Sequence, residues 1–80
     1  MEINEIHNEL KFKEYEATSL QLEIGLTQNQ IYWEDDETHI IFLTDHLGVL
    51  QYELDRLHAD IYLLKRELKI LENRKKFPVY

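Results

Sequence analysis

Apolar residues recur at alternating spacings of three and four throughout the second half of the chain. The series holds no polar residue and extends over more than four heptads: Ile40, Leu43, Leu47, Leu50, Leu54, Leu57, Ile61, Leu64, Leu68 and Leu71. A repeat of 3.5 residues keeps one stripe of a helix facing a partner helix, as the a and d positions of a coiled coil do. The pattern predicts a helix from about residue 38 to residue 75, roughly 55 Å long at ~1.5 Å per residue.

The first half of the chain repeats the same spacing less cleanly. Two positions of its series are polar and one is small: Ile3, Ile6, Leu10, Lys13, Ala17, Leu20, Ile24, Thr27 and Ile31. The series predicts a first helix over about residues 3–31. Gly25 has two interpretations, because a glycine either is tolerated inside a helix at a cost of ~1 kcal/mol or ends the helix in a left-handed turn. In the second case residues 27–30 resemble a capping box for a further helical turn.

A strand is the alternative for part of this segment. The stretch "SLQLEIGLT", residues 19–27, alternates apolar and polar residues as a half-buried strand does. Its only candidate partners are "IYW" and "HIIFL", and the second of these already belongs to the long apolar series. If the alternation prevails, the fold becomes α+β, with a small hairpin at about residues 20–33.

Four consecutive acids, Glu34, Asp35, Asp36 and Glu37, separate the two heptad segments. We expect the chain to turn there, over about residues 32–37, because two long amphipathic helices joined by a short loop pack antiparallel. Acidic side chains are favoured at the N-terminal end of a helix, so that the acids have an ordinary structural explanation. Asp36 or Thr38 is expected to cap the free amide groups of the second helix.

The resulting prediction is an all-α fold in a single domain, residues 1–80, built as an antiparallel coiled-coil hairpin. Pro78 cannot continue a helix, so we expect residues 76–80 to form a short tail.

Both predicted helices are apolar on a second side, nearly opposite the a/d stripe. A helix that is apolar on two sides is usually buried on two sides, and one hairpin can cover only one of them. We therefore expect a homodimer that closes a four-helix bundle, with the following residues as candidates for its interface: Phe12, Leu22, Leu26, Val49, Leu63 and Ile70.

Aromatic and acidic residues around the turn are candidates for binding a different protein. Five tyrosines and one tryptophan are many for 80 residues, and tyrosine and tryptophan concentrate in binding hot spots. The candidate set for a heterologous protein partner is Tyr15, Tyr32, Trp33, Glu34, Asp35, Asp36, Glu37 and Tyr52.

Composition narrows the setting of the protein. The chain has no cysteine, a net charge of −7 and no apolar run long enough to span a membrane, so we expect a cytoplasmic protein. Residues 1–64 hold 14 acids and 3 bases, whereas residues 65–80 hold 2 acids and 6 bases. The acidic balance makes nucleic acid an unexpected partner, since phosphate binding requires clustered Lys and Arg. Abundant Ile, Lys, Glu, Asn and Tyr is compatible with a low-GC bacterium or its phage.

No residue pattern in the chain indicates catalysis, a bound cofactor or a metal. A phosphate-binding glycine loop, a nucleophile elbow and the EF-hand spacing are all absent. Asp35 or Asp36 could face His39 on a helix, but di-iron bundles require paired Glu-x-x-His motifs, and the chain has none. We therefore expect no enzyme, no cofactor and no metal site.

Three functional hypotheses remain. The first is a small interaction protein that acts as a regulator, adaptor or inhibitor through its apolar and aromatic surface. The second is a structural or assembly module that only oligomerises through its helices. The third is an acidic decoy that mimics nucleic acid and engages a basic protein with these side chains: Glu34, Asp35, Asp36, Glu37, Asp45, Glu53, Asp55 and Asp60.

Overall fold

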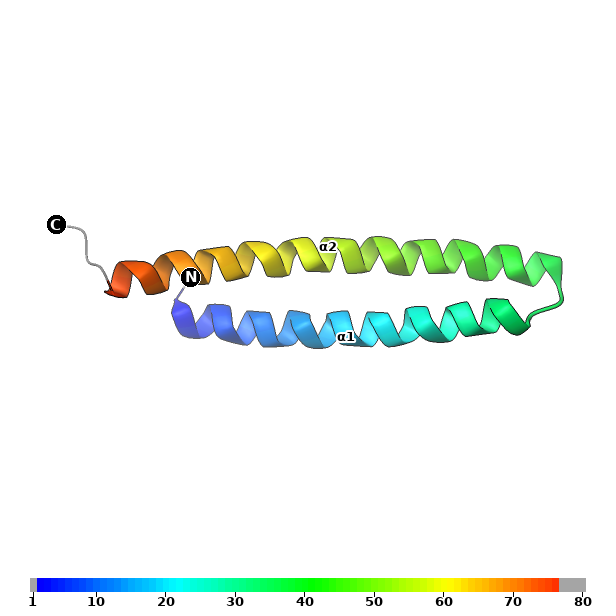
Figure 1. The fold of residues 1–80 in the computed structure, drawn as a ribbon, viewed down its shortest axis with the longest axis horizontal. Helices are drawn as coiled ribbons and strands as arrows, with labels where there is room; N and C mark the ends of the chain where they lie inside the picture. Colours follow the sequence, from blue (N-terminus) through cyan, green and yellow to red (C-terminus); the bar gives the residue numbers. More distant parts are fainter. Residues whose placement is uncertain (1, 77–80) are drawn as a thin grey trace.

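The computed structural model describes residues 2–76, which form two long helices joined by a short turn (Figure 1). Helix α1 spans Ile3–Trp33 and helix α2 spans Glu37–Lys76, with 31 and 40 residues. The two helices lie side by side and antiparallel in an elongated rod of 66 × 15 × 15 Å. The predicted all-α helical hairpin is confirmed.

The core of the hairpin is the seam between the two helices. Every buried residue of the described chain belongs to the predicted heptad series: Ile6, Leu10, Ala17, Thr27, Leu43, Leu50, Leu57 and Ile61. The remaining members of the series are half-buried along the edges of this line. The helices therefore pack as the 3.5-residue period requires, because only residues three and four apart stay on the facing side of each helix.

The two polar members of the seam, Lys13 and Thr27, both find partners for their polar groups within the hairpin. Lys13 extends its ammonium group to the edge of the seam, where Nζ lies 3.6 Å from Glu9 Oε1 and 3.7 Å from Asp60 Oδ2. The Thr27 hydroxyl is buried and donates to the carbonyl of Glu23 at 2.8 Å. Both residues can thus occupy core positions without leaving a buried polar atom unpaired.

The strand hypothesis for residues 20–33 is wrong, because α1 runs through this whole segment without a break. The alternation that suggested a strand arises from Leu22 and Leu26, which are both 67% exposed on the outer side of the helix. No glycine among the described residues has a positive φ, so Gly25 does not end α1. The capping-box interpretation also fails, since Thr27 bonds back to the preceding helical turn instead of starting a new one.

The turn is shorter than the sequence indicates. Tyr32 and Trp33 belong to the last turn of α1, and α2 begins at Glu37, so only residues 34–36 connect the helices. The turn therefore takes three residues instead of the six predicted over residues 32–37, because α1 continues through Tyr32 and Trp33 and because Asp36 caps α2 directly before Glu37. The predicted tail lies outside the described residues from residue 77 onward.

Neither helix has an apolar stretch long enough to cross a membrane over the described residues.

Gly25 lies in the interior of α1, and a Cβ added there meets no atom within 4 Å. The variant Gly25→Ala is expected to raise the free energy of unfolding by about 1 kcal/mol, because alanine is the better helix former. Urea denaturation followed by far-ultraviolet circular dichroism measures the change. Gly48→Ala, at an equally open site of α2, should behave alike. A loss of stability in Gly25→Ala would contradict the continuous helix.

Candidate interaction surface

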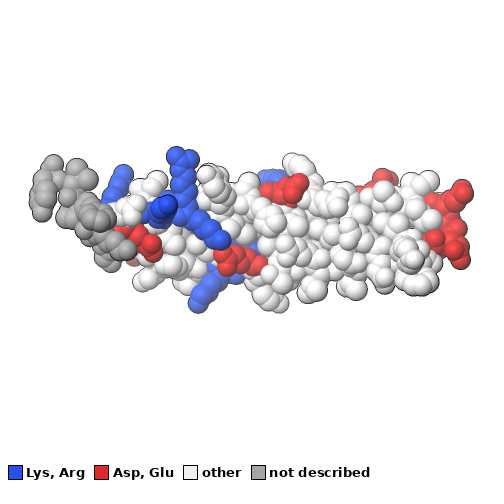
Figure 2. Space-filling model, viewed as in Figure 1, with Lys and Arg blue, Asp and Glu red and all other residues white. Residues whose placement is uncertain are grey.

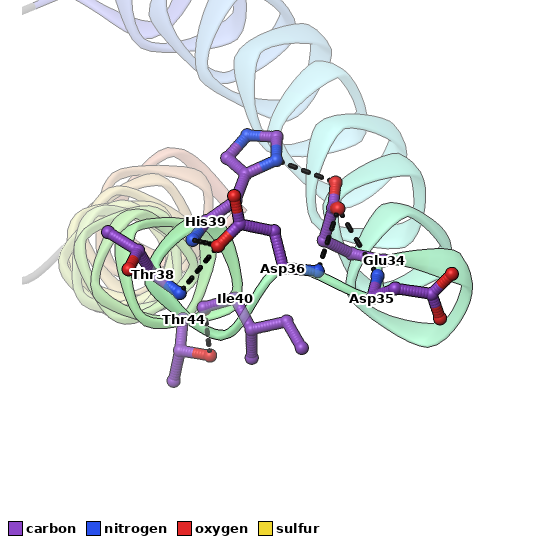
Figure 3. Close-up of polar contacts among 7 residues, drawn as sticks. All are labelled: Glu34, Asp35, Asp36, Thr38, His39, Ile40 and Thr44. Atoms are coloured by element: carbon purple, nitrogen blue, oxygen red, sulfur yellow. Dashed lines mark hydrogen bonds and ion pairs between the residues drawn. The ribbon is translucent and has the colours of Figure 1, made fainter.

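The turn is held by the carboxylate of Glu34, which follows the last residue of α1 (Figure 3). Its Oε1 accepts hydrogen bonds from the amides of Asp35 and Asp36 at 3.2 and 3.1 Å. Its Oε2 lies 2.6 Å from Nδ1 of His39, which projects from the first turn of α2. One carboxylate therefore ties the end of α1, the connecting residues and the start of α2 together.

Asp36 caps the N-terminus of α2, and like Glu34 it accepts two backbone amides with one carboxylate oxygen. Its Oδ1 accepts the amides of Thr38 and His39 at 2.9 and 3.4 Å, while its own carbonyl accepts the amide of Ile40 at 2.9 Å. These are the amides that an α-helix leaves without internal partners at its start. The expectation that Asp36 or Thr38 caps the second helix is resolved in favour of Asp36.

Hydrogen bonding lowers the pKa of Glu34 below its ordinary value. The amide of Asp36 has the largest effect, the side chain of His39 the next, and both favour the charged carboxylate over the protonated acid. The Glu34 carboxylate is therefore ionised at neutral pH and acts as a structural element of the turn.

The four acids of the turn are not equivalent as partner-binding candidates. Glu34 and Asp36 direct their carboxylates to backbone amides of this chain. Asp35 and Glu37 are exposed, and their carboxylates form no hydrogen bond or ion pair with another described residue. Only the second pair is free to meet another molecule without weakening the turn.

The aromatic candidates are all exposed. Tyr32 and Trp33 are 78% and 73% exposed, and their rings meet edge to face with centroids 5.0 Å apart. Tyr15 and Tyr52 lie near the middle of the rod, and the guanidinium of Arg56 lies 6.0 Å from the centroid of the Tyr52 ring. The structure does not gather these four rings into one cluster, because they belong to different stretches of the two helices.

The six candidates for a dimer interface are likewise exposed in the single hairpin. Their exposed fractions run from 44% to 67%: Phe12, Leu22, Leu26, Val49, Leu63 and Ile70. Three further exposed residues, Ile41, Phe42 and Tyr62, were missed by the sequence analysis. Phe42 precedes Val49 by one heptad, so extending the second apolar stripe by seven residues would have found it.

Charge is separated along the rod. Residues 14–55, which contain the turn, hold ten acids and no Lys or Arg, whereas residues 1–13 and 56–80 hold six acids and nine bases. The formal charges of these parts are −10 and +3. On the face drawn in Figure 2, acidic side chains gather at the turn end and the Lys and Arg side chains lie toward the other end. The molecule is therefore an electrostatic dipole as well as an acidic rod.

The carboxylate and imidazole groups considered for a metal site do not converge. His39 turns its ring toward Glu34, while the Asp36 carboxylate caps the helix. Within residues 2–76 no group of three or more His, Asp or Glu side chains has the arrangement to hold a metal ion. The cluster at the turn is accounted for by its bonds to backbone amides.

Removing the cap of α2 should weaken the hairpin. Asp36→Ala is expected to lower the free energy of unfolding by about 1 kcal/mol, because two helix amides lose their acceptor. Asp35→Ala is the matched control, since it removes the neighbouring acid without removing a side-chain bond, and should change stability by less than about 0.5 kcal/mol. Equal effects in urea denaturation would show that only the charge of the turn matters.

The lowered pKa of Glu34 predicts a pH-dependent contribution to stability. The ionised carboxylate stabilises the folded state above the pKa of the unfolded chain, and this contribution is lost as pH falls through the lower pKa of the folded state. Wild type should therefore be more stable than Glu34→Gln at about pH 5, and the difference should shrink as pH falls to about 3. Urea denaturation across this range measures it.

Asp45→Asn provides the control for that series, because the Asp45 carboxylate forms no hydrogen bond or ion pair with another described residue. This variant removes one negative charge, as Glu34→Gln does, without removing a hydrogen bond of the turn. A Glu34→Gln difference that changes with pH no more than the difference of this control would contradict the structural role of the Glu34 carboxylate.

Comparison of the chain with protein-family models, with curated proteins and with solved structures finds no match.

Proposed function

We propose that this protein is a small, non-enzymatic interaction module that regulates, links or inhibits another protein by covering part of its surface. The observation that supports the proposal is the amount of apolar surface outside the seam. Among the described residues, thirteen large apolar or aromatic side chains are between 44% and 78% exposed. The core of the described hairpin, by comparison, buries seven hydrophobic side chains.

Energetics explain why such a surface favours binding. Each large apolar side chain that remains in water forgoes ~1.5–3 kcal/mol relative to full burial. Single exposed apolar residues are common in soluble proteins, but rows of them along a helix are typical of surfaces that meet another molecule. Association with a partner is favourable for such a hairpin, because it buries exposed apolar side chains that the two helices cannot cover themselves.

A pure oligomerisation module is the second candidate, and the charge separation along the rod favours it. A second copy packed antiparallel would place the acidic turn half of one hairpin over the basic half of the other. Such a dimer is the four-helix bundle expected from the two apolar stripes. Sedimentation equilibrium distinguishes the candidates, because an oligomeriser is a tight dimer or larger at every salt concentration whereas the proposed module stays available to a different protein.

The acidic decoy has less support. Two of its charged groups, Glu34 and Asp36, already hold backbone amides, so they are poor mimics of freely displayed phosphates. Binding by a decoy would also weaken steeply with salt, since the attraction of exposed charges is screened. Docking through apolar side chains is far less sensitive to salt.

The direct test is photo-crosslinking in cells of the organism that encodes the protein. A benzophenone amino acid placed at Trp33 or Phe42 is expected to capture one defined heterologous protein, because both are large apolar side chains that the hairpin leaves exposed. The matched control is the same amino acid at Gln51, an exposed polar position of α2. Crosslinks only to a second copy would favour the oligomeriser, and no crosslink above the Gln51 control would contradict both.

A further inference from the structure

The two broad sides of the hairpin differ in charge. Along one edge of the seam the helices pair acid with base, since Lys65 lies 3.6 Å from Glu14 and His7 lies 3.9 Å from Glu72. We call the side that carries these pairs the paired face. The opposite edge has acids from both helices, and we call the side that carries it the acidic face.

The acidic face repeats carboxylates at heptad spacing. Its acids recur every seventh residue: Glu2 directly before α1, then Glu9, Glu16 and Glu23 on α1, and Glu53, Asp60 and Glu67 on α2. Lys13 bridges Glu9 and Asp60, and His46 lies 3.8 Å from Glu23. Glu16 and Glu53 form no ion pair with any described residue, although Glu16 is half-buried. The cations of this edge are fewer than its seven acids: Lys13, Arg56 in the groove beside it and Arg74 seven residues after Glu67. The edge therefore keeps a net negative charge.

Open grooves between the helices follow this edge. The first is lined by charged side chains over an apolar floor made by Leu20 and Leu57: Lys13, Glu16, Glu53, Arg56 and Asp60. A second continues from it, sharing Lys13 and Asp60 and adding Glu9, Leu63 and Leu64. Because the two grooves share Lys13 and Asp60, they adjoin along this edge of the seam.

The paired face has a groove of different character. It is lined by Glu14, Thr18, Gln21, His58 and Lys65, with Ala17 and Ile61 beneath them. Its acid and its lysine already form an ion pair with each other. A charged ligand would find no excess of either sign there.

Exposed apolar side chains flank the acidic face. Leu63 lines the acidic groove, which places its heptad position on that side of the hairpin. The same heptad position recurs every seven residues along each helix, and seven of its ten occupants in the described helices are apolar and exposed: Phe12, Leu26, Trp33, Phe42, Val49, Leu63 and Ile70. The acidic face thus presents a central line of carboxylates between two apolar rows.

We propose that the acidic face receives a cationic amphipathic helix of another protein. The inference rests on the proposed interaction function and specifies the chemistry of the partner. A third helix can lie in the groove parallel to the first two, with its apolar side on the outer rows. Its Lys or Arg side chains then meet Glu16 and Glu53, whose charges the hairpin leaves unpaired.

A second copy of this chain is the poorer occupant of the acidic face. Two such faces in contact would bring heptad lines of carboxylates together, and like charges across an interface oppose association. The apolar rows of α2 extend from Phe42 to Ile70, which corresponds to roughly 42 Å of helix at ~1.5 Å per residue. A partner helix of that length can follow the rows over most of the rod.

The test uses a fluorescently labelled peptide of leucine and lysine in heptad register, about 28 residues long so that it is helical when bound. Fluorescence anisotropy measures its affinity for the full chain at low and at high salt. The peptide is expected to bind wild type, and a peptide with glutamate in place of lysine is expected not to bind. Binding of both, or of neither, overturns the proposal.

Two variant pairs locate the binding face. Glu16→Gln with Glu53→Gln should weaken binding of the lysine peptide about tenfold at low salt, since two charge contacts are lost. The control pair Glu14→Gln with Asp55→Asn removes the same net charge away from the acidic face and should change affinity by less than about twofold. Equal weakening by both pairs means attraction by net charge alone and overturns the proposal.

The apolar rows are tested in the same way. Leu26→Ser with Leu63→Ser should weaken binding about tenfold, because both side chains would be covered by the helix. Ile41→Ser with Tyr62→Ser changes two exposed residues at a heptad position adjoining the paired face, and should leave binding within about twofold of wild type. Unchanged binding by the first pair would mean purely electrostatic adhesion and would overturn the proposal. Circular dichroism verifies that every variant is folded.

Failure of this proposal is distinguishable from failure of the proposed function. If the benzophenone variants at Trp33 or Phe42 capture a protein in cells while the lysine peptide does not bind, the interaction module stands and the cationic helix is wrong. If neither experiment gives a complex, both are wrong.

Discussion

A single line of contact between two helices holds this molecule together, and its narrowness determines nearly everything else about the surface. Two helices can bury only one stripe each, so every apolar side chain of the described residues outside the heptad series remains in water. In a rod 15 Å thick there is no second layer to cover them. The exposed rows are therefore a direct consequence of the two-helix architecture, and they are also the main indication of what the protein does.

Two of the acidic residues in the turn stabilise the fold itself, because they bind backbone amides of this chain. Glu34 and Asp36 accept four backbone amides between them, which allows three residues to reverse the chain direction. Charges that look like a binding site in the sequence are thus occupied by the ends of the helices. The carboxylates and exposed apolar side chains along the two helices are therefore better candidates for binding a partner than Glu34 and Asp36.

The pairing of charges across the seam distinguishes the two faces of the hairpin. On the paired face, Glu14 meets Lys65, so this edge reinforces the hairpin. On the acidic face Lys13 pairs with Asp60, whereas Glu16 and Glu53 form no ion pair with a described residue, and exposed ion pairs add so little stability that the fold tolerates the omission. The proposed cationic helix would add positive charge beside the carboxylates that the pair between Lys13 and Asp60 leaves over.

The sequence by itself determined the seam, because a 3.5-residue apolar period has only one geometric meaning when it persists over many turns. Every buried position of the described chain, Thr27 included, followed from that period, and so did the half-buried Lys13 at the edge of the seam. Local patterns were less reliable. Leu22 and Leu26 imitated a strand because alternation does not distinguish an outer helical row from a buried face, and the helix ends depended on which side chain reached the free amides.

Tertiary structure alone decided which residues meet across the seam. The antiparallel register brings Glu14 to Lys65 and Lys13 to Asp60, and no spacing within one helix specifies such a pairing. For the same reason the acidic face became visible only when the carboxylates of both helices lined one groove. Periodicity is a property of one helix, whereas a face is shared by two, and its chemistry exists only once their packing sets the register.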